Sequence, residues 1–94
     1  MIIALDYDKT YTADSDLWDM FIAMAQSRGH QVICITMRYP NKAEQIDRTN
    51  FKVNALYYTS RKAKLRWINE FNVKVDIWID DKPGYLFDNA VDAL

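Results

Sequence analysis

Two pairs of aspartates carry the strongest chemical signal in this sequence. Asp6 and Asp8 stand two residues apart directly after an apolar run, and Asp80 and Asp81 follow another apolar run. Carboxylates held this close raise each other's pKa unless a cation lies between them. A hard divalent ion with oxygen ligands, above all Mg²⁺, removes that cost. One pair alone is expected to cap a loop or a helix, but both pairs together favour a metal site made of Asp6, Asp8, Asp80 and Asp81.

An aspartate beside such a metal ion can do more than bind it. It can attack phosphorus as a covalent nucleophile, while a second aspartate protonates the leaving oxygen and later activates water. The metal ion and nearby cations then stabilise the charge on the phosphoryl oxygens. Acids in this pattern therefore predict phosphoryl-transfer chemistry.

Side chains that could hold a phosphoryl group lie farther along the chain. Lys62 and Lys64 stand in the first turn of a predicted helix, where a bound phosphate offsets their unfavourable interaction with the helix dipole. Lys64 is preferred because of its spacing to the segment that ends in Asp80, although either lysine could equally be a solvated surface residue. Thr36 could bind a phosphoryl oxygen or simply end a strand, and Arg38 could pair with a substrate phosphate.

The elements that must position these residues alternate in type. Short continuous apolar runs, typical of strands covered on both faces, alternate with segments of helical period. This alternation predicts an α/β fold with a mainly parallel sheet and a ligand site at the carboxyl ends of the strands, where the candidate residues stand. The predicted strands are 1–5, 31–36, 53–58 and 75–79, and the predicted helices are 15–28, 42–49, 60–71 and 85–94.

Capping and apolar residues support the helices. Asn41 and Ser60 can cap the helices that follow them. Leu17, Trp18, Phe21, Ile22, Met24 and Ala25 recur at helical spacing, and we expect Leu86, Phe87, Val91 and Leu94 to pack from the last helix.

Length and composition limit the class of protein. The chain has 94 residues, of which 50% are apolar and 27% charged, with two glycines and two prolines. These values exclude a disordered or collagen-like chain and predict a single domain over residues 1–94. Asp6 and Asp8 interrupt the apolar start, so we expect no signal peptide, and no apolar run of the given sequence has membrane-spanning length. The single cysteine, Cys34, lies in an apolar run. We therefore expect no membrane contact, a cytoplasmic location and a buried, inert thiol.

Charge is distributed unevenly along the chain. Residues 1–37, 38–66 and 67–94 have net charges of −3, +6 and −4, although the whole chain has −1. A basic middle between acidic ends is a hint of anion binding next to a carboxylate cluster. Solvated helix faces explain the same pattern, so charge alone leaves both interpretations open.

Four segments together resemble the conserved motifs of the haloacid dehalogenase (HAD) superfamily, in the order that this family has them. The segments are the apolar strand with Asp6-Tyr7-Asp8-Lys9-Thr10, then Val32-Ile33-Cys34-Ile35-Thr36, then Lys64, then Ile77-Trp78-Ile79-Asp80-Asp81. The resemblance covers essentially the whole chain. It implies a Rossmann-like three-layer sandwich in which the four strands have the order 3-2-1-4.

The resemblance also implies a role for each site residue. Asp6 would be the nucleophile and Asp8 the general acid and base. Asp6, the main-chain carbonyl of Asp8 and Asp80 would hold Mg²⁺, with Asp81 near the metal. The two remaining residues, Thr36 and Lys64, would bind the phosphoryl group.

Two features depart from the usual family pattern. Lys9 stands where many members have glycine, and no segment is long enough to form a cap domain. An uncapped site implies a bulky phosphorylated substrate, such as a nucleotide, a nucleic-acid end or a phosphoprotein, or a site completed by another subunit of a homo-oligomer.

The function that these observations predict is a Mg²⁺-dependent phosphohydrolase that acts on a phosphomonoester through an aspartyl-phosphate. The main alternative is a non-catalytic module that binds a nucleotide or phosphate on the same scaffold. A phosphoacceptor signalling domain ranks lower, because such domains have the acceptor aspartate after the third strand, where Tyr57-Tyr58-Thr59 stands here. Nucleic-acid binding by the basic segment 38–66 is a further hypothesis.

Overall fold

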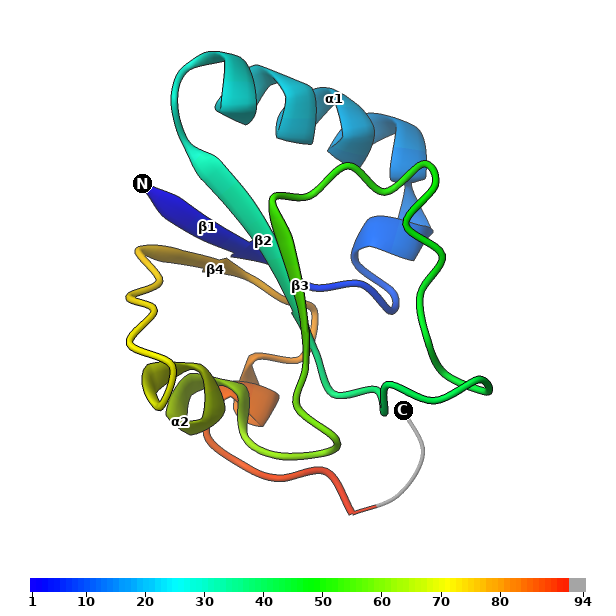
Figure 1. The fold of residues 1–94 in the computed structure, drawn as a ribbon, viewed down its shortest axis with the longest axis vertical. Helices are drawn as coiled ribbons and strands as arrows, with labels where there is room; N and C mark the ends of the chain where they lie inside the picture. The colour runs from blue at the N-terminus through cyan, green and yellow to red at the C-terminus, as the bar shows by residue number, and fades with distance from the viewer. Residues whose placement is uncertain (92–94) are drawn as a thin grey trace.

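Four parallel strands form one sheet at the centre of the molecule (Figure 1). The computed structural model describes residues 1–91. The strands have the order β3-β2-β1-β4, which confirms the predicted Rossmann-like α/β fold and its strand order. The strands are β1 (Ile2–Leu5), β2 (Gln31–Thr36), β3 (Ala55–Tyr58) and β4 (Ile77–Ile79).

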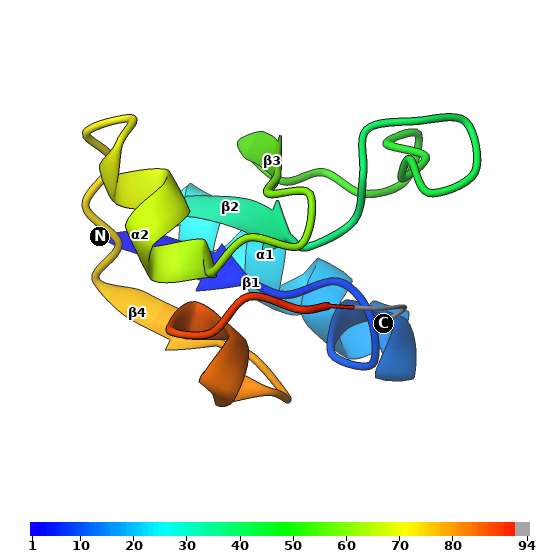
Figure 2. The same cartoon turned by 90° about the horizontal axis from the view of Figure 1, so that it is seen from below.

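Helices cover both faces of the sheet (Figure 2). Side chains alternate across a strand, so Ile3 and Leu5 of β1 face the helix α1 (Ser15–Ser27), while Ala4 faces the shorter helix α2 (Lys64–Asn69). The continuous apolar runs of the sequence therefore arise because both faces are buried.

The helix α1 begins and ends close to its predicted bounds. The Asp14 carboxylate accepts the Leu17 N–H at 3.2 Å and caps the helix. Trp18, Phe21, Ile22 and Ala25 pack toward the sheet, but Leu17 and Met24 are exposed. The sheet therefore covers only part of the apolar stripe of this helix.

The predicted helix over 42–49 is wrong, because the connection between β2 and β3 forms turns there instead. The Asn41 side chain does accept the Glu44 N–H, but only one turn follows. The Ile46 N–H donates to the Tyr58 hydroxyl at 2.8 Å, and Ile46, Phe51 and Val53 join the core that α1 covers. These three residues do not recur at helical spacing, so an irregular chain can bury them together where a helix would not.

The helix predicted over 60–71 is shorter than expected, and Ser60 does not cap it. Ser60 and Arg61 have φ values of 54° and 71°, in the left-handed region that a right-handed helix excludes. The Arg61 N–H donates to the Met37 carbonyl, which ties this loop to the end of β2. As a result, α2 begins only at Lys64.

The predicted last helix, over 85–94, is also wrong within the described residues. A short 3₁₀ helix spans Pro83–Leu86, and irregular chain follows. Leu86 is buried as expected, whereas Phe87 and Val91 are 68% and 99% exposed, and Leu94 lies outside the described residues. The chain here bonds to the loop before α2: the Ala63 N–H donates to the Asn89 side chain at 2.7 Å. These contacts replace the hydrogen bonds of a helix.

Three further observations concern the sequence predictions. Cys34 is fully buried, and its burial raises the pKa of the thiol, in keeping with an inert core residue. Residues 1–91 contain no cap domain. In the same residues, no helix has the length and apolar character needed to cross a membrane.

Candidate active site

The predicted site residues meet at the carboxyl ends of the strands. Asp6 directly follows β1, Thr36 ends β2 and Asp80 directly follows β4, so the parallel sheet brings all three to one edge. One solvent-open pocket at this edge has a volume of about 30 Å³. Its lining residues are Asp6, Asp8, Lys9, Thr36, Met37, Lys64, Asp80, Asp81, Lys82 and Tyr85.

The turn after β1 holds the first acidic pair in place. Lys9 has a φ of 63°, in the left-handed region that glycine adopts most easily. A lysine at this position therefore carries some backbone strain. The Thr10 hydroxyl lies 3.1 Å from both Asp6 Oδ2 and Asp81 Oδ1, and it accepts the Asp81 N–H at 3.2 Å. Thr10 therefore connects the turn after β1 to the turn after β4.

Lys64 lies between two of the carboxylates. Its Nζ is 2.8 Å from Asp6 Oδ1 and 2.6 Å from Asp80 Oδ2, and all three side chains are less than a tenth exposed. Lys62, the other lysine of the predicted pair, is exposed to solvent. Because α2 begins at Lys64, its side chain enters the site from the first residue of the helix.

Asp6, Asp80 and Asp81, together with Lys64, form what we call the carboxylate cluster. One carboxylate oxygen of each aspartate lies within 4.8 Å of the others. Hard oxygen donors at this spacing fit a divalent ion such as Mg²⁺. With three acids and one base, the cluster keeps an excess of negative charge that a cation would neutralise.

Burial changes the protonation equilibria of this cluster. Desolvation raises the pKa of Asp6 to about 7, although the adjacent Lys64 ammonium acts in the opposite direction. Burial alone would lower the pKa of Lys64, but Asp6 and Asp80 outweigh it and raise that pKa above its ordinary value. Lys64 therefore stays charged, while Asp6 is only partly ionised near neutral pH when no other cation is present.

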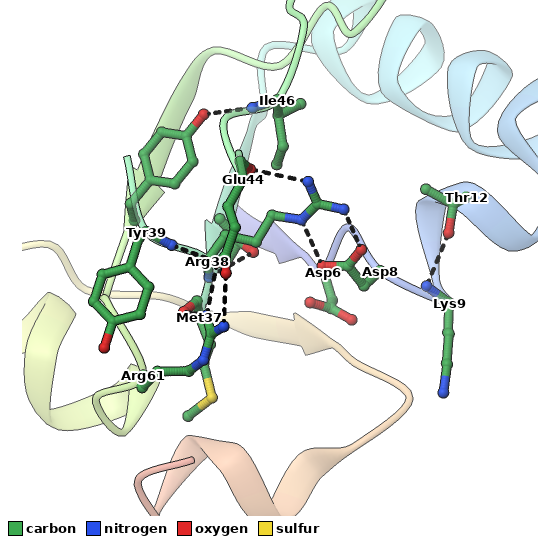
Figure 3. A network of polar contacts seen from close by, with 12 residues as sticks. Asp6, Asp8, Lys9, Thr12, Met37, Arg38, Tyr39, Glu44, Ile46 and Arg61 are labelled. Carbon is green, nitrogen blue, oxygen red and sulfur yellow. Dashed lines mark hydrogen bonds and ion pairs between the residues drawn. The ribbon is translucent and has the colours of Figure 1, made fainter. Parts of the chain in front are cut away.

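Asp8 lines the same pocket, but its carboxylate belongs to a different group of contacts. The Arg38 guanidinium binds it through two nitrogens, with Nη2 at 2.6 Å from Oδ1 and Nε at 2.9 Å from Oδ2 (Figure 3). The Asp8 side chain is therefore not one of the three carboxylates that cluster. Its main-chain carbonyl, the atom that the family resemblance assigns to the metal, is independent of this contact.

We call the group formed by Asp8, Arg38, Glu44 and Arg61 the arginine network. Arg38 Nη1 donates to the Glu44 carbonyl at 2.9 Å, and both Glu44 carboxylate oxygens accept from Arg61, at 2.8 and 2.9 Å. The Tyr39 N–H also donates to Glu44. The hydrogen bonds from Arg61 and, to a smaller extent, from the Tyr39 N–H lower the pKa of Glu44 to about 2.

Thr36 is buried at the floor of the pocket. Its hydroxyl oxygen accepts the Arg38 N–H at 3.3 Å, and its exposed fraction is only 1%. The hydroxyl hydrogen is free to rotate toward the pocket, because the contact with Arg38 uses the oxygen as an acceptor. Thr36 can therefore donate to an oxyanion in the pocket.

Some residues around the site were not singled out from the sequence. Thr10 was present in the first motif, so its position could have been inferred from the pattern itself. Glu44 and Arg61 gave no comparable signal, because they are 17 residues apart and come from irregular segments. Tyr85 and Lys82 line the pocket only because the 3₁₀ helix turns back beneath it.

Fold and site together define a class: a parallel α/β domain with clustered acids, a buried lysine and a hydroxyl at the carboxyl edge of its sheet. Comparison of the chain with family models, curated proteins and solved structures finds no match. The function must therefore be inferred from the geometry of the residues.

Proposed function

We propose that this protein is a Mg²⁺-dependent phosphohydrolase of the HAD type that works through an aspartyl-phosphate on Asp6. The observation that carries the proposal is the convergence of Asp6, Asp80 and Asp81 with Lys64 and Thr36 around one pocket. These residues are the nucleophile, metal ligands and oxyanion partners that phosphoryl transfer requires.

In the first step, an Asp6 carboxylate oxygen attacks phosphorus and the bond from phosphorus to the leaving oxygen breaks. The Asp8 carboxyl group gives its proton to the leaving oxygen, which departs as an alcohol. Lys64 and the Thr36 hydroxyl bind the phosphoryl oxygens as their charge is redistributed. The product of this step is an acyl phosphate on Asp6.

In the second step, water attacks the phosphorus of the aspartyl-phosphate. The Asp8 carboxylate, left without its proton, takes one from this water, and the bond between phosphorus and the Asp6 oxygen breaks. Inorganic phosphate leaves, Asp6 is again a carboxylate and Asp8 is again protonated. The two steps therefore restore the starting state.

The ligands for a magnesium ion would be the Asp6 and Asp80 carboxylates and the main-chain carbonyl of Asp8, with Asp81 next to them. The donor set fits, because it is made of hard oxygens and carries uncompensated negative charge. Bound magnesium would supply positive charge that lets an anionic phosphate approach an anionic nucleophile.

The size of the pocket bears on the substrate. The pocket is small, with a volume of about 30 Å³, and it opens to solvent. A leaving group can therefore extend out of the opening, and the pocket does not restrict its bulk. This supports a nucleotide, a nucleic-acid end or another bulky phosphoester, and completion of the site by a second subunit stays a prediction.

The decisive experiment measures the hydrolysis of p-nitrophenyl phosphate with and without Mg²⁺. We expect activity that requires the metal and falls by about a thousandfold or more in Asp6→Asn, since the nucleophile is lost. Asp16→Asn is the matched control: it makes the same change at an exposed position in the first turn of α1 and should behave as the wild type.

Full activity in Asp6→Asn would overturn the nucleophile assignment. If the wild type binds a nucleotide in the presence of Mg²⁺ but releases no phosphate from any phosphomonoester tested, the non-catalytic binding module is the correct alternative.

A further inference from the structure

The contact between Asp8 and Arg38 is the feature that the proposed reaction leaves unexplained. Both Asp8 carboxylate oxygens accept hydrogen bonds from Arg38, which has only donors to offer (Figure 3). In this arrangement both Asp8 oxygens are engaged by Arg38, although Asp8 lines the pocket. A general acid and base must have at least one oxygen within hydrogen-bond reach of the reacting atoms.

Arg38 is held in place independently of Asp8. Its Nη1 donates to the Glu44 carbonyl, and its guanidinium carbon lies 5.2 Å from the centre of the Tyr7 ring. Its backbone N–H donates to the Thr36 hydroxyl oxygen. The Glu44 end of this support is fixed in turn by Arg61. Arg38 would therefore keep its position if Asp8 moved away.

The guanidinium is also within reach of a ligand. The side chains of Arg38 and Asp8 are 25% and 29% exposed, in contrast to the nearly buried pair of Lys64 and Asp80. Asp8 lines the reactive pocket, and Arg38 follows Thr36, which lines it too, by two residues. Arg38 itself does not line the pocket, but an anion that replaces Asp8 on Arg38 would lie next to it.

We propose that Arg38 recognises a second phosphate of the substrate and that this recognition releases Asp8 for catalysis. The inference rests on the proposed function and narrows its substrate class to phosphate esters with a neighbouring phosphate. A nucleoside bisphosphate and the phosphorylated end of a nucleic acid share this chemistry.

The exchange keeps the charge and the hydrogen bonds of Arg38 balanced. A phosphate group presents two oxygens to a guanidinium with the same forked geometry as a carboxylate. Arg38 therefore loses one bidentate anionic partner and gains another. Asp8, freed from Arg38, can take up a proton from solvent, rotate toward the leaving oxygen and give the proton to it.

Competition between Asp8 and the ligand gives a test that does not depend on turnover. Calorimetry is done with Mg²⁺ in an Asp6→Asn background, which prevents the reaction, and the probes are adenosine 3′,5′-bisphosphate and adenosine 5′-monophosphate. Adding Asp8→Asn removes the internal competitor, so we expect bisphosphate to bind about tenfold more tightly. Adding Arg38→Gln should instead weaken it about tenfold, and with Arg38 absent Asp8→Asn should bring no gain.

The monophosphate is the control ligand, and its affinity should respond to Asp8→Asn much less than that of the bisphosphate. Equal changes for both ligands, or no tightening in Asp8→Asn, would show that the pair with Arg38 is only structural. A dinucleotide with a terminal phosphate forms a second arm: tightening with it, but not with the bisphosphate, would identify the second group as a phosphodiester.

Kinetics on the protein with Asp6 intact separate this inference from the proposed function. The ratio of kcat/KM for the bisphosphate to that for the monophosphate should fall about tenfold in Arg38→Gln, whichever way the separate values move. If the wild type hydrolyses neither ester while the binding pattern holds, the proposed function fails and the anion subsite remains. An unchanged ratio in an active enzyme overturns the subsite instead.

Discussion

The carboxylate cluster and the arginine network lie side by side at one edge of the sheet, yet they are built on opposite principles. The cluster sets three acids against one lysine, with most of its side chains buried. The network pairs two acids with two arginines, and each pair is bidentate and partly exposed. The charges of the network already balance one another, whereas a buried group with excess negative charge is costly until a cation neutralises it. The contrast indicates that the cluster, rather than the network, is the place for a metal ion.

The two groups also differ in what holds them. The members of the cluster stand at strand ends or at the start of α2, on the most regular part of the molecule. The network depends on the irregular segment 37–54 and on the loop before α2. Precise geometry is easier to hold on regular elements. This agrees with a nucleophile and metal ligands in the cluster, and with an adjustable contact between Asp8 and Arg38 in the network.

Removing the central cation of each group should give the largest difference in stability. Lys64→Gln leaves two nearly buried carboxylates without their partner, and we expect a loss of about 3 kcal/mol in the free energy of unfolding. Arg38→Gln removes a partly exposed partner and should cost about 1 kcal/mol. Chemical denaturation of the metal-free protein measures both.

Lys62→Gln is the matched control, because it makes the same change at an exposed lysine two residues away and should alter stability by less than about 0.5 kcal/mol. Equal losses in Lys64→Gln and Lys62→Gln would contradict the buried position of Lys64.

Adding magnesium should stabilise the protein through the cluster alone. At a concentration about a hundred times the Kd, a ligand that binds only the folded state adds about 2.7 kcal/mol to the free energy of unfolding. Thermal denaturation should show this gain in the wild type and in Glu44→Gln, but less than half of it in Asp80→Asn. A gain that survives in Asp80→Asn would exclude the cluster as the metal site.

The two groups should also give opposite responses to pH in the metal-free protein. The pKa of Asp6 is about 7 in the folded state against 3.8 in the unfolded chain, so the folded state binds the extra proton and stability falls as pH rises from about 4 to 7. The pKa of Glu44 is about 2 against 4.5, so its contribution is present above pH 4.5 and is lost as pH falls toward 2.

Chemical denaturation across this pH range tests the response of Asp6 and that of Glu44, each with its own variant. Asp6→Asn should flatten the fall between pH 4 and 7, and Glu44→Gln should flatten the loss in acid. A wild type whose stability rises from pH 4 to 7 by as much as that of Asp6→Asn would show that Asp6 does not carry a raised pKa.

Much of the fold could be predicted because its signals are local. The apolar run before Asp6 and the run that ends in Thr36 both indicate buried strands, and both strands form. Predictions failed where local signals were overruled by distant contacts. Asn41 does cap a turn, but the Ile46 N–H then bonds to Tyr58 instead of continuing a helix. The chain after Leu86 likewise bonds to the loop before α2 instead of forming the predicted last helix.

The sequence by itself determined that acids follow two buried strands and that a lysine and a threonine are available to meet them, since strand period and residue type are written in the chain. Only the tertiary structure decided which base faces which acid. Lys64 reaches Asp6 and Asp80 because α2 begins only at Lys64. Arg38 binds Asp8 because β2 pairs with β1, so the residues that follow these two strands lie close together. Such pairings depend on distances between residues far apart in the chain, and those distances exist only after the strands have assembled.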